Sequence, residues 1–171
     1  GAVTTNHPLR SGKGSLYEGG IRVPLIIKPP GKNTGGRVSN HRVVTYDLHQ
    51  TILNLTESGK IDENSDGIDF SGLLSGKSEK TNESPIFFHY PHYYETTTPV
   101  SAIIHEDRKL MQYNETGKSE LYDLRNDPAE KQNLVDQSPE IAARLQKMLS
   151  DWKKSIKAQN PSPNNSFKGK S

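Results

Sequence analysis

The chain contains no cysteine. This absence excludes disulfides, thiolate metal ligands and a cysteine nucleophile within its 171 residues. Long hydrophobic runs are also missing, and no apolar stretch reaches the roughly 20 residues that a membrane-spanning helix needs. Neither sign of charge is in excess. The formal net charge is +2, so no strong attraction to nucleic acid or to an acidic membrane is expected.

Apolar residues are scarce as well. They make up 30% of the sequence, which also holds 14 glycines and 11 prolines. This balance favours a loop-rich domain of ordinary size with a thin core. The chain starts at Gly1 rather than at a methionine, from which we expect a fragment or a processed product.

The most informative stretch is a glycine-hinged, charged segment that covers residues 6–31. Glycine pairs at positions 12 and 14 and at positions 19 and 20 indicate tight turns, because glycine permits positive φ and close backbone approach. Residues 21–27 are apolar apart from Arg22, with Pro24 as an interruption, which predicts a buried strand. A charged loop that runs into a strand is a common way to hold a cation beside an anionic ligand.

Two parts of this segment carry a family resemblance. Residues 8–13 (Pro-Leu-Arg-Ser-Gly-Lys) and 17–24 (Tyr-Glu-Gly-Gly-Ile-Arg-Val-Pro) closely resemble the second signature region of type I sulfatases, in the alkaline phosphatase superfamily. The resemblance implies that Lys13 contacts the sulfate group and acts in catalysis, where an ammonium stabilises charge developing on the leaving oxygen. The alternative for Lys13 is a solvated surface lysine. Three other motif residues are interpreted as supporting ones: Arg10, Glu18 and Arg22.

The same resemblance assigns the remaining chemistry to residues outside this chain. In type I sulfatases a formylglycine made from an upstream Cys or Ser attacks sulfur, and upstream Asp and Asn residues bind Ca²⁺. Gly1 matches the last residue of the family's Asp-Asn-Gly calcium triplet. We therefore expect no metal ligand here, calcium and formylglycine in a missing N-terminal part, and no sulfate-ester hydrolysis by this chain alone.

Apolar residues at helical spacing predict a helix over residues 43–55, with Thr45 as a candidate N-cap. Asp47 within it is interpreted as a buried or capping residue rather than a ligand, because no partner motif lies nearby. Aspartates at positions 62, 66 and 69 have the spacing of a calcium loop but lack the terminal Glu of an EF-hand. We expect a structural turn there.

The second half predicts an antiparallel meander followed by one helix. Strands are expected over residues 86–90, 100–104, 109–113 and 121–124, with turns between them. Ser138 is a good N-cap and Pro139 suits the first helical position. One apolar stripe is expected to dock this helix: Ile141, Leu145, Met148, Leu149, Trp152 and Ile156. Segments 101–110 and 120–134 resemble the sulfatase C-terminal subdomain.

Two histidines are candidate substrate contacts. His92 lies among aromatic residues at 90–94, where an imidazole can bond to a sugar or protonate a leaving group. A packed or exposed loop histidine is an equally good interpretation of His92. His7, beside the lysine motif, is the second candidate. His89 is interpreted as structural.

Together these features predict the C-terminal portion of a sulfatase with an α/β fold, which is α+β within this chain. Residues 1–84 would belong to the catalytic α/β domain, residues 85–159 to an antiparallel subdomain with a terminal helix, and residues 160–171 to a disordered tail. The expected substrates are sulfated carbohydrates or aryl sulfates, in the periplasm or outside the cell. Two alternatives stay open: a phosphodiesterase or phosphonate hydrolase of the superfamily, and a non-enzymatic carbohydrate-binding module.

Overall fold

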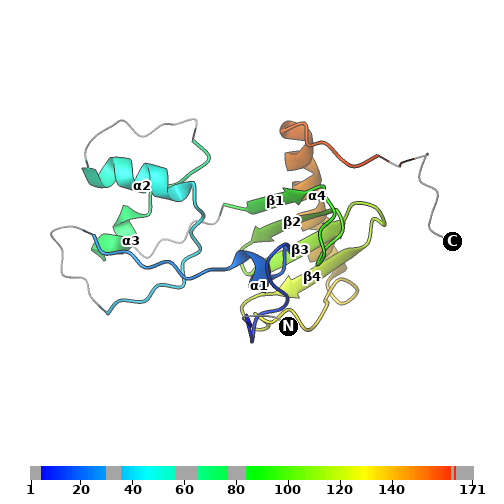
Figure 1. Ribbon diagram of the computed structural model, residues 1–171, viewed down its shortest axis with the longest axis horizontal. Coiled ribbons are helices and arrows are strands. Elements are labelled where there is room, and N and C mark those ends of the chain that lie inside the picture. The colour runs from blue at the N-terminus through cyan, green and yellow to red at the C-terminus, as the bar shows by residue number, and fades with distance from the viewer. Residues whose placement is uncertain (1–4, 30–35, 57–64, 77–83, 163, 165–171) are drawn as a thin grey trace. The chain divides into compact units, whose positions relative to one another are not determined.

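The computed structural model describes residues 5–29, 36–56, 65–76, 84–162 and 164. The chain divides into two compact units, one made of residues 1–23 and 84–171 and the other of residues 24–83 (Figure 1). The boundary near residue 84 was expected, but the first 23 residues group with the later sheet rather than with residues 24–83. Most of the expected tail, residues 160–171, lies outside the described residues.

The first unit is built on a four-stranded antiparallel sheet in the order β1-β2-β3-β4. The predicted meander is therefore confirmed, with each strand within two residues of its expected bounds. A tight turn joins the two central strands, where Glu106 adopts φ 55°. The strands are β1 Ile86–Tyr90, β2 Val100–His105, β3 Arg108–Tyr113 and β4 Ser119–Asp123.

The sheet has a separate apolar layer on each face, because side chains alternate along every strand. Ile103, Leu110 and Leu121 pack against helix α4 (Pro139–Ser155). The opposite face, which includes Met111, packs against Leu16 of the N-terminal segment. Figure 1 shows the short helix α1 (Glu18–Ile21) in front of the sheet and α4 behind it. The N-terminal loop and α4 therefore occupy opposite faces.

Helix α4 begins as expected, with Ser138 at the N-cap position and Pro139 first, although the Ser138 side chain makes no capping hydrogen bond. Leu145 and Leu149 are fully buried, which contributes about 1.5–3 kcal/mol each. The expected place of Ile156 in the apolar stripe is wrong: it is 50% exposed, because it follows the last helical residue and the chain turns away there.

Residues 21–27 do not form the predicted buried strand. The chain leaves α1 at Arg22 and continues without strand pairing, and Val23 and Ile26 are 79% and 92% exposed. Pro24 lacks the N–H that a central strand donates. Within the described parts of the chain no strand lies alongside this segment, so its apolar side chains remain in contact with water.

The second unit holds two helices, α2 (Asp47–Thr56) and α3 (Ser71–Ser75). The predicted helix over 43–55 exists but starts at Asp47. The Val44 N–H donates to Asp47 Oδ2 at 2.8 Å and the Ile68 N–H to Oδ1 at 3.0 Å. Neither N–H belongs to the first turn of α2, so Asp47 ties the start of the helix to neighbouring segments, and the capping bond expected from Thr45 is not seen among the described residues. The structural interpretation of Asp47, which is 3% exposed, is confirmed.

The aspartates after α2 serve local structure where they are described. Asp69 Oδ1 accepts the Ser71 N–H at the start of α3, and Asp69 Oδ2 accepts the Asn54 side-chain amide at 2.7 Å. The expected turn is confirmed at Asp69. Asp62 lies outside the described residues.

Candidate functional site

Lys13 sits on a loop that is fixed through its backbone. Its carbonyl accepts a hydrogen bond from Thr96 Oγ1 at 3.1 Å. The next residue, Gly14, adopts φ 89°, and a Cβ there would lie 2.1 Å from the Tyr94 ring. Only glycine fits a backbone that is both left-handed and this close to an aromatic ring. The loop is thereby clamped against the 91–98 segment.

The Lys13 side chain is exposed, and its ammonium has no hydrogen bond or ion pair with any residue that the structure describes. A lysine with a fixed backbone and an unpaired ammonium is suited to meeting an external anion. Several charged side chains near the loop are instead paired with other groups of the protein, as the next contacts show.

A buried ion cluster lies beneath the loop. Lys109 is fully buried on β3, with its Nζ 3.2 Å from Glu18 Oε1 and 2.8 Å from Glu130 Oε1. The Glu18 N–H also donates to Glu130 Oε2 at 2.6 Å. Burial raises the pKa of Glu130, and the Lys109 ammonium opposes that rise. Since Glu18 opens α1, this cluster attaches the end of the lysine loop to the sheet.

Arg10 is the second attachment. Its Nη1 donates to the Tyr122 hydroxyl and to the Glu130 carbonyl, both at 2.9 Å, and its guanidinium lies 3.9 Å from the Tyr17 ring centroid. The hydroxyls of Tyr17 and Tyr122 donate to Glu120 Oε2 at 2.7 and 2.9 Å. Burial, with these hydrogen bonds, raises the pKa of both tyrosines, so they remain protonated donors.

The supporting roles expected for Arg10 and Glu18 are confirmed by these contacts. Their partners on the sheet side, Lys109, Tyr122 and Glu130, were not found by sequence reasoning. The available signal for Lys109 was its place in β3, where alternation puts it on the same face as the apolar Met111. Nothing in the sequence indicates which carboxylates would meet it.

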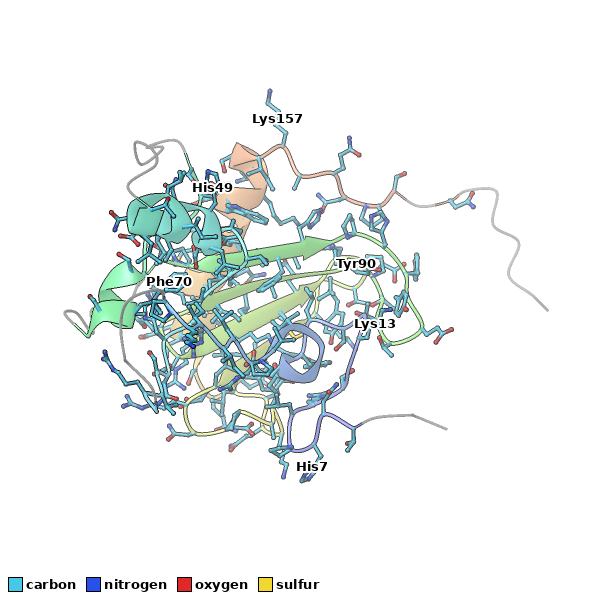
Figure 2. The ribbon with its side chains drawn as sticks, turned by 60° about the vertical axis from the view of Figure 1, so that its left-hand side comes forward. His7, Lys13, His49, Phe70, Tyr90 and Lys157 are labelled. Carbon is cyan, nitrogen blue, oxygen red and sulfur yellow. The ribbon has the colours of Figure 1, made fainter. Side chains whose placement is uncertain are left out.

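The structure brings the His92 loop, but not His7, beside Lys13. His92 is exposed, with its ring edge-on to Tyr90 at a centroid distance of 5.5 Å. Thr96 and Tyr94 of the same loop contact the lysine loop. Figure 2 shows Tyr90 and Lys13 on one side of the sheet and His7 apart from both. The roles given to His92 and His7 stay predictions.

His89 has a structural role, as expected. Its Nδ1 lies 2.8 Å from Ser101 Oγ, and its Nε2 lies 2.8 Å from the Gln159 carbonyl. Because a carbonyl only accepts, Nε2 carries the proton. Both ring nitrogens are thus engaged within the protein.

The described residues do not fit a calcium site. No three side chains of the ligand types His, Cys, Asp or Glu converge among them. The carboxylates of Asp47 and Asp69 already accept backbone N–H groups. We therefore derive no step of the chemistry through a metal held here.

No helix in the described parts is long and apolar enough to cross a membrane.

Comparison with known proteins places this arrangement in a family. The model of the family "N-sulphoglucosamine sulphohydrolase, C-terminal" matches residues 11–156, which is most of the chain. The chain belongs to this sulfatase family. The predicted resemblance to the C-terminal portion of a sulfatase is confirmed.

Relatives and solved structures agree with that assignment. A sulfatase of Formosa agariphila is 32% identical over 166 residues, covering 87% of this chain and 30% of the relative. Human arylsulfatase A is 29% identical over 165 residues, with coverages of 82% and 32%. The crystal structure of Ps i-CgsB superposes with a TM-score of 0.73 at 27% identity, over 92% of this chain and 34% of that one. The chain thus spans about a third of the length of the relatives it matches.

The predicted fold class is confirmed as well. The antiparallel sheet with its packed helix is the α+β arrangement expected for this region of an alkaline-phosphatase-like sulfatase, and solved structures similar to it include one titled a 2-O GAG sulfatase, at 27% identity and a TM-score of 0.55. In this sulfatase C-terminal region the candidate site is the Lys13 loop together with the 91–98 loop.

Proposed function

We propose that this sulfatase C-terminal region belongs to an enzyme that hydrolyses sulfate monoesters of sulfated carbohydrates, and that Lys13 binds the sulfate group. One observation carries the proposal: within the segment matched by the family, Lys13 has a clamped backbone and an exposed ammonium without a partner among the described residues. Relatives named as sulfatases support the reaction class, and one of them is an ulvan-active sulfatase of Formosa agariphila. Ps i-CgsB has also been solved with k-i-k-neocarrahexaose.

The chemistry required of Lys13 is electrostatic. A sulfate monoester carries one negative charge spread over three oxygens, and further charge develops on the bridging oxygen as the S–O bond breaks. A cation already fixed beside these oxygens stabilises the transition state without having to reorganise. Gly14 and the Thr96 hydrogen bond hold the backbone from which the Lys13 side chain extends toward the anion.

His92 would contact the carbohydrate or donate a proton to the leaving oxygen. Its position on the loop that contacts the Lys13 loop supports that role. His7 is retained as a predicted substrate contact, although it lies apart from Lys13 in Figure 2. The nucleophile, a formylglycine, and the calcium ligands would come from the rest of the protein, in the periplasm or outside the cell.

The test compares two lysine variants of the full-length protein. Lys13→Ala should lower kcat/KM for 4-nitrophenyl sulfate and for a sulfated oligosaccharide about 10²- to 10³-fold, the usual effect of removing one transition-state donor. Lys131→Ala, which removes an equally exposed lysine after β4, should stay within twofold.

Thermal unfolding of both variants checks that the fold is retained. Undiminished turnover by the Lys13 variant would refute the role of that residue. A full-length protein that cleaves bis(4-nitrophenyl) phosphate faster than sulfate esters would instead favour the phosphodiesterase alternative.

A further inference from the structure

A polar cleft lies at the C-terminal end of α4, apart from the candidate site. Its volume is about 390 Å³, and it is bounded by β3, by the last turns of α4 and by the segment after the helix. The polar side chains that line it are two glutamines, one asparagine, one serine and three lysines: Gln112, Gln146, Asn160, Ser150, Lys153, Lys154 and Lys157. No carboxylate belongs to the lining that the structure describes. The cleft is therefore uniformly cationic with amide groups between the charges.

The cleft is separate from the candidate sulfatase site. Gln112 and Leu110 lie two residues apart on β3 and therefore share the face of the sheet that packs against α4. The Lys13 loop covers the opposite face. Figure 2 shows Lys157 beyond the end of the helix and far from Lys13. A ligand held in this cleft would not occupy the position assigned to the sulfate being hydrolysed.

Lysines near a helix C-terminus interact favourably with the helix dipole, which gives an alternative reason for lysines at the end of α4. It accounts for Lys153 and Lys154 in the last turn. It does not account for Lys157, which lies past the helix with φ 52°. The hydrogen bonds Lys157 N–H to Lys154 O and Ala158 N–H to Lys153 O form a Schellman motif, in which Lys157 holds the left-handed position where glycine is preferred.

Lys157 therefore occupies a position where a side chain costs free energy, and its ammonium has no partner among the residues described. Lys154 is likewise exposed, and although Asp151 lies near enough to feel its charge, its ammonium makes no hydrogen bond with a described residue. Lys153 differs, since its Nζ donates to Asn114 Oδ1 at 3.2 Å and burial lowers its pKa. Lys153 belongs to the structure of the cleft wall, and the two other lysines face the ligand.

We propose that this cleft binds a segment of an anionic carbohydrate chain, with Lys154 and Lys157 contacting its sulfate or carboxylate groups. Ammonium groups bind such anions through charge-assisted hydrogen bonds. The amides of Gln112, Gln146 and Asn160 offer both donors and acceptors, as sugar hydroxyls require. A cleft of this volume falls in the range of small-ligand sites, about 300–1,000 Å³.

The overall charge of the chain argues against nucleic acid as the ligand. Nucleic-acid sites present extended basic surfaces, whereas this chain has a net charge of +2 and a single confined cluster of lysines in the cleft. Binding in the cleft does not depend on hydrolysis. It would hold a polymeric chain on the protein while another part of the chain is processed.

The experiment measures the affinity of the full-length protein for dextran sulfate, with neutral dextran and double-stranded DNA as competitors. The double variant Lys154→Gln/Lys157→Gly should weaken binding about threefold to twentyfold, the effect expected for two exposed charge contacts. The control Lys131→Gln/Arg125→Gln removes two exposed cations outside the cleft and should leave binding nearly unchanged.

The glycine in the double variant separates binding from stability. The single variant Lys157→Gly places glycine at a left-handed position, so its melting temperature should stay the same or rise while its affinity for dextran sulfate falls. Equal losses in the cleft and control variants, no loss in either, or displacement by DNA as effective as by free dextran sulfate would overturn the proposal. If the wild type cleaves neither 4-nitrophenyl sulfate nor a sulfated oligosaccharide and the binding difference persists, the proposed function fails and the cleft assignment stands.

Discussion

At the scale of single residues, Lys109 is the position where we expect a substitution to cost the most folding free energy. Its ammonium is fully buried between Glu18 and Glu130, and among the described residues only Glu18 has a second cation within reach, the exposed Arg22 at 3.8 Å. Removing one partner of a buried ion pair leaves uncompensated charge, which costs about 3–5 kcal/mol. We expect Lys109→Met to lower the free energy of unfolding by that amount, as measured by urea denaturation, although methionine preserves the length of the side chain.

The control for this prediction is Lys147→Met. Lys147 is 77% exposed and pairs with Asp151 on the surface of α4, where an ion pair contributes at most about 1 kcal/mol. If both variants lost similar stability, the buried cluster would not hold the N-terminal loop on the sheet in the way inferred here.

Asp123 gives a second prediction at this scale, on acid stability. Burial opposes ionisation of its carboxyl, but hydrogen bonds from Asn126 and the ion pair with Arg108 outweigh burial and hold the pKa at about 2, below the ordinary 3.8. A lowered pKa means that the folded state binds fewer protons than the unfolded state between these values. This contribution is complete above pH 4 and is lost as the pH falls toward about 2.

We therefore expect Asp123→Asn to be less stable than the wild type at neutral pH, with the difference shrinking as the pH falls from about 4 to about 2. Thermal unfolding of both proteins across that interval measures it. A stability difference that does not change with pH would contradict the stated role of the carboxylate.

At the scale of elements, the sequence predicts those whose partners are close along the chain. The four strands and α4 carry their own apolar alternation and caps, and each packs on a neighbour within the same unit. The segment 21–27 has an equally apolar pattern but no strand beside it in the described residues. A pattern of apolar residues indicates that a segment can be buried. Whether it is buried depends on the presence of another element to pack against.

In the candidate site, too, the sequence predicts some residues and not others. Lys13 is found from its motif, because glycines and charges at fixed spacing mark a loop. The groups that hold the loop, Lys109 and Glu130, lie about a hundred residues later in the chain and could not be paired from one sequence. Long-range ion pairing depends on strand register, which the residue types alone do not specify.

The lysine loop yields the prediction at this scale. Gly14→Ala adds a Cβ that would collide with the Tyr94 ring and also forces a side chain into φ 89°. Gly117→Ala is the matched control, since Gly117 has φ 67° but open space around its Cα. Backbone strain affects both, at about 1–2 kcal/mol. Only the Gly14 variant should also displace the loop.

In the full-length protein we thus expect Gly14→Ala to lower kcat/KM for 4-nitrophenyl sulfate by at least tenfold, while Gly117→Ala leaves it nearly unchanged. The threshold follows from the sensitivity of catalysis to small displacements of a positioned group. Equal activity in the two variants would show that the contact with Tyr94 does not position Lys13.

At the scale of the whole molecule, the proposed sulfate-binding residue Lys13 stands without the rest of a reaction centre among the described residues. The residues that the structure describes include no metal cluster, and the sequence lacks the Cys/Ser-x-Pro/Ala-x-Arg motif in which a formylglycine is made. Electrostatic stabilisation by Lys13 lowers a barrier only when a nucleophile is present to attack sulfur. The proposed function therefore assigns turnover to the longer protein and only sulfate binding to these residues.

The corresponding prediction concerns the isolated 171-residue chain. It should fold, because its sheet and α4 form their own core, and it should not release 4-nitrophenol from 4-nitrophenyl sulfate above the background rate. Near-ultraviolet circular dichroism reports folding through Trp152, which stacks on Phe87 at a centroid distance of 4.7 Å. A folded chain that turned over the ester would require a nucleophile among its own residues, and the division of labour proposed for Lys13 would then be wrong. A folded and inactive chain that gains activity when the remainder of the protein is present would support it.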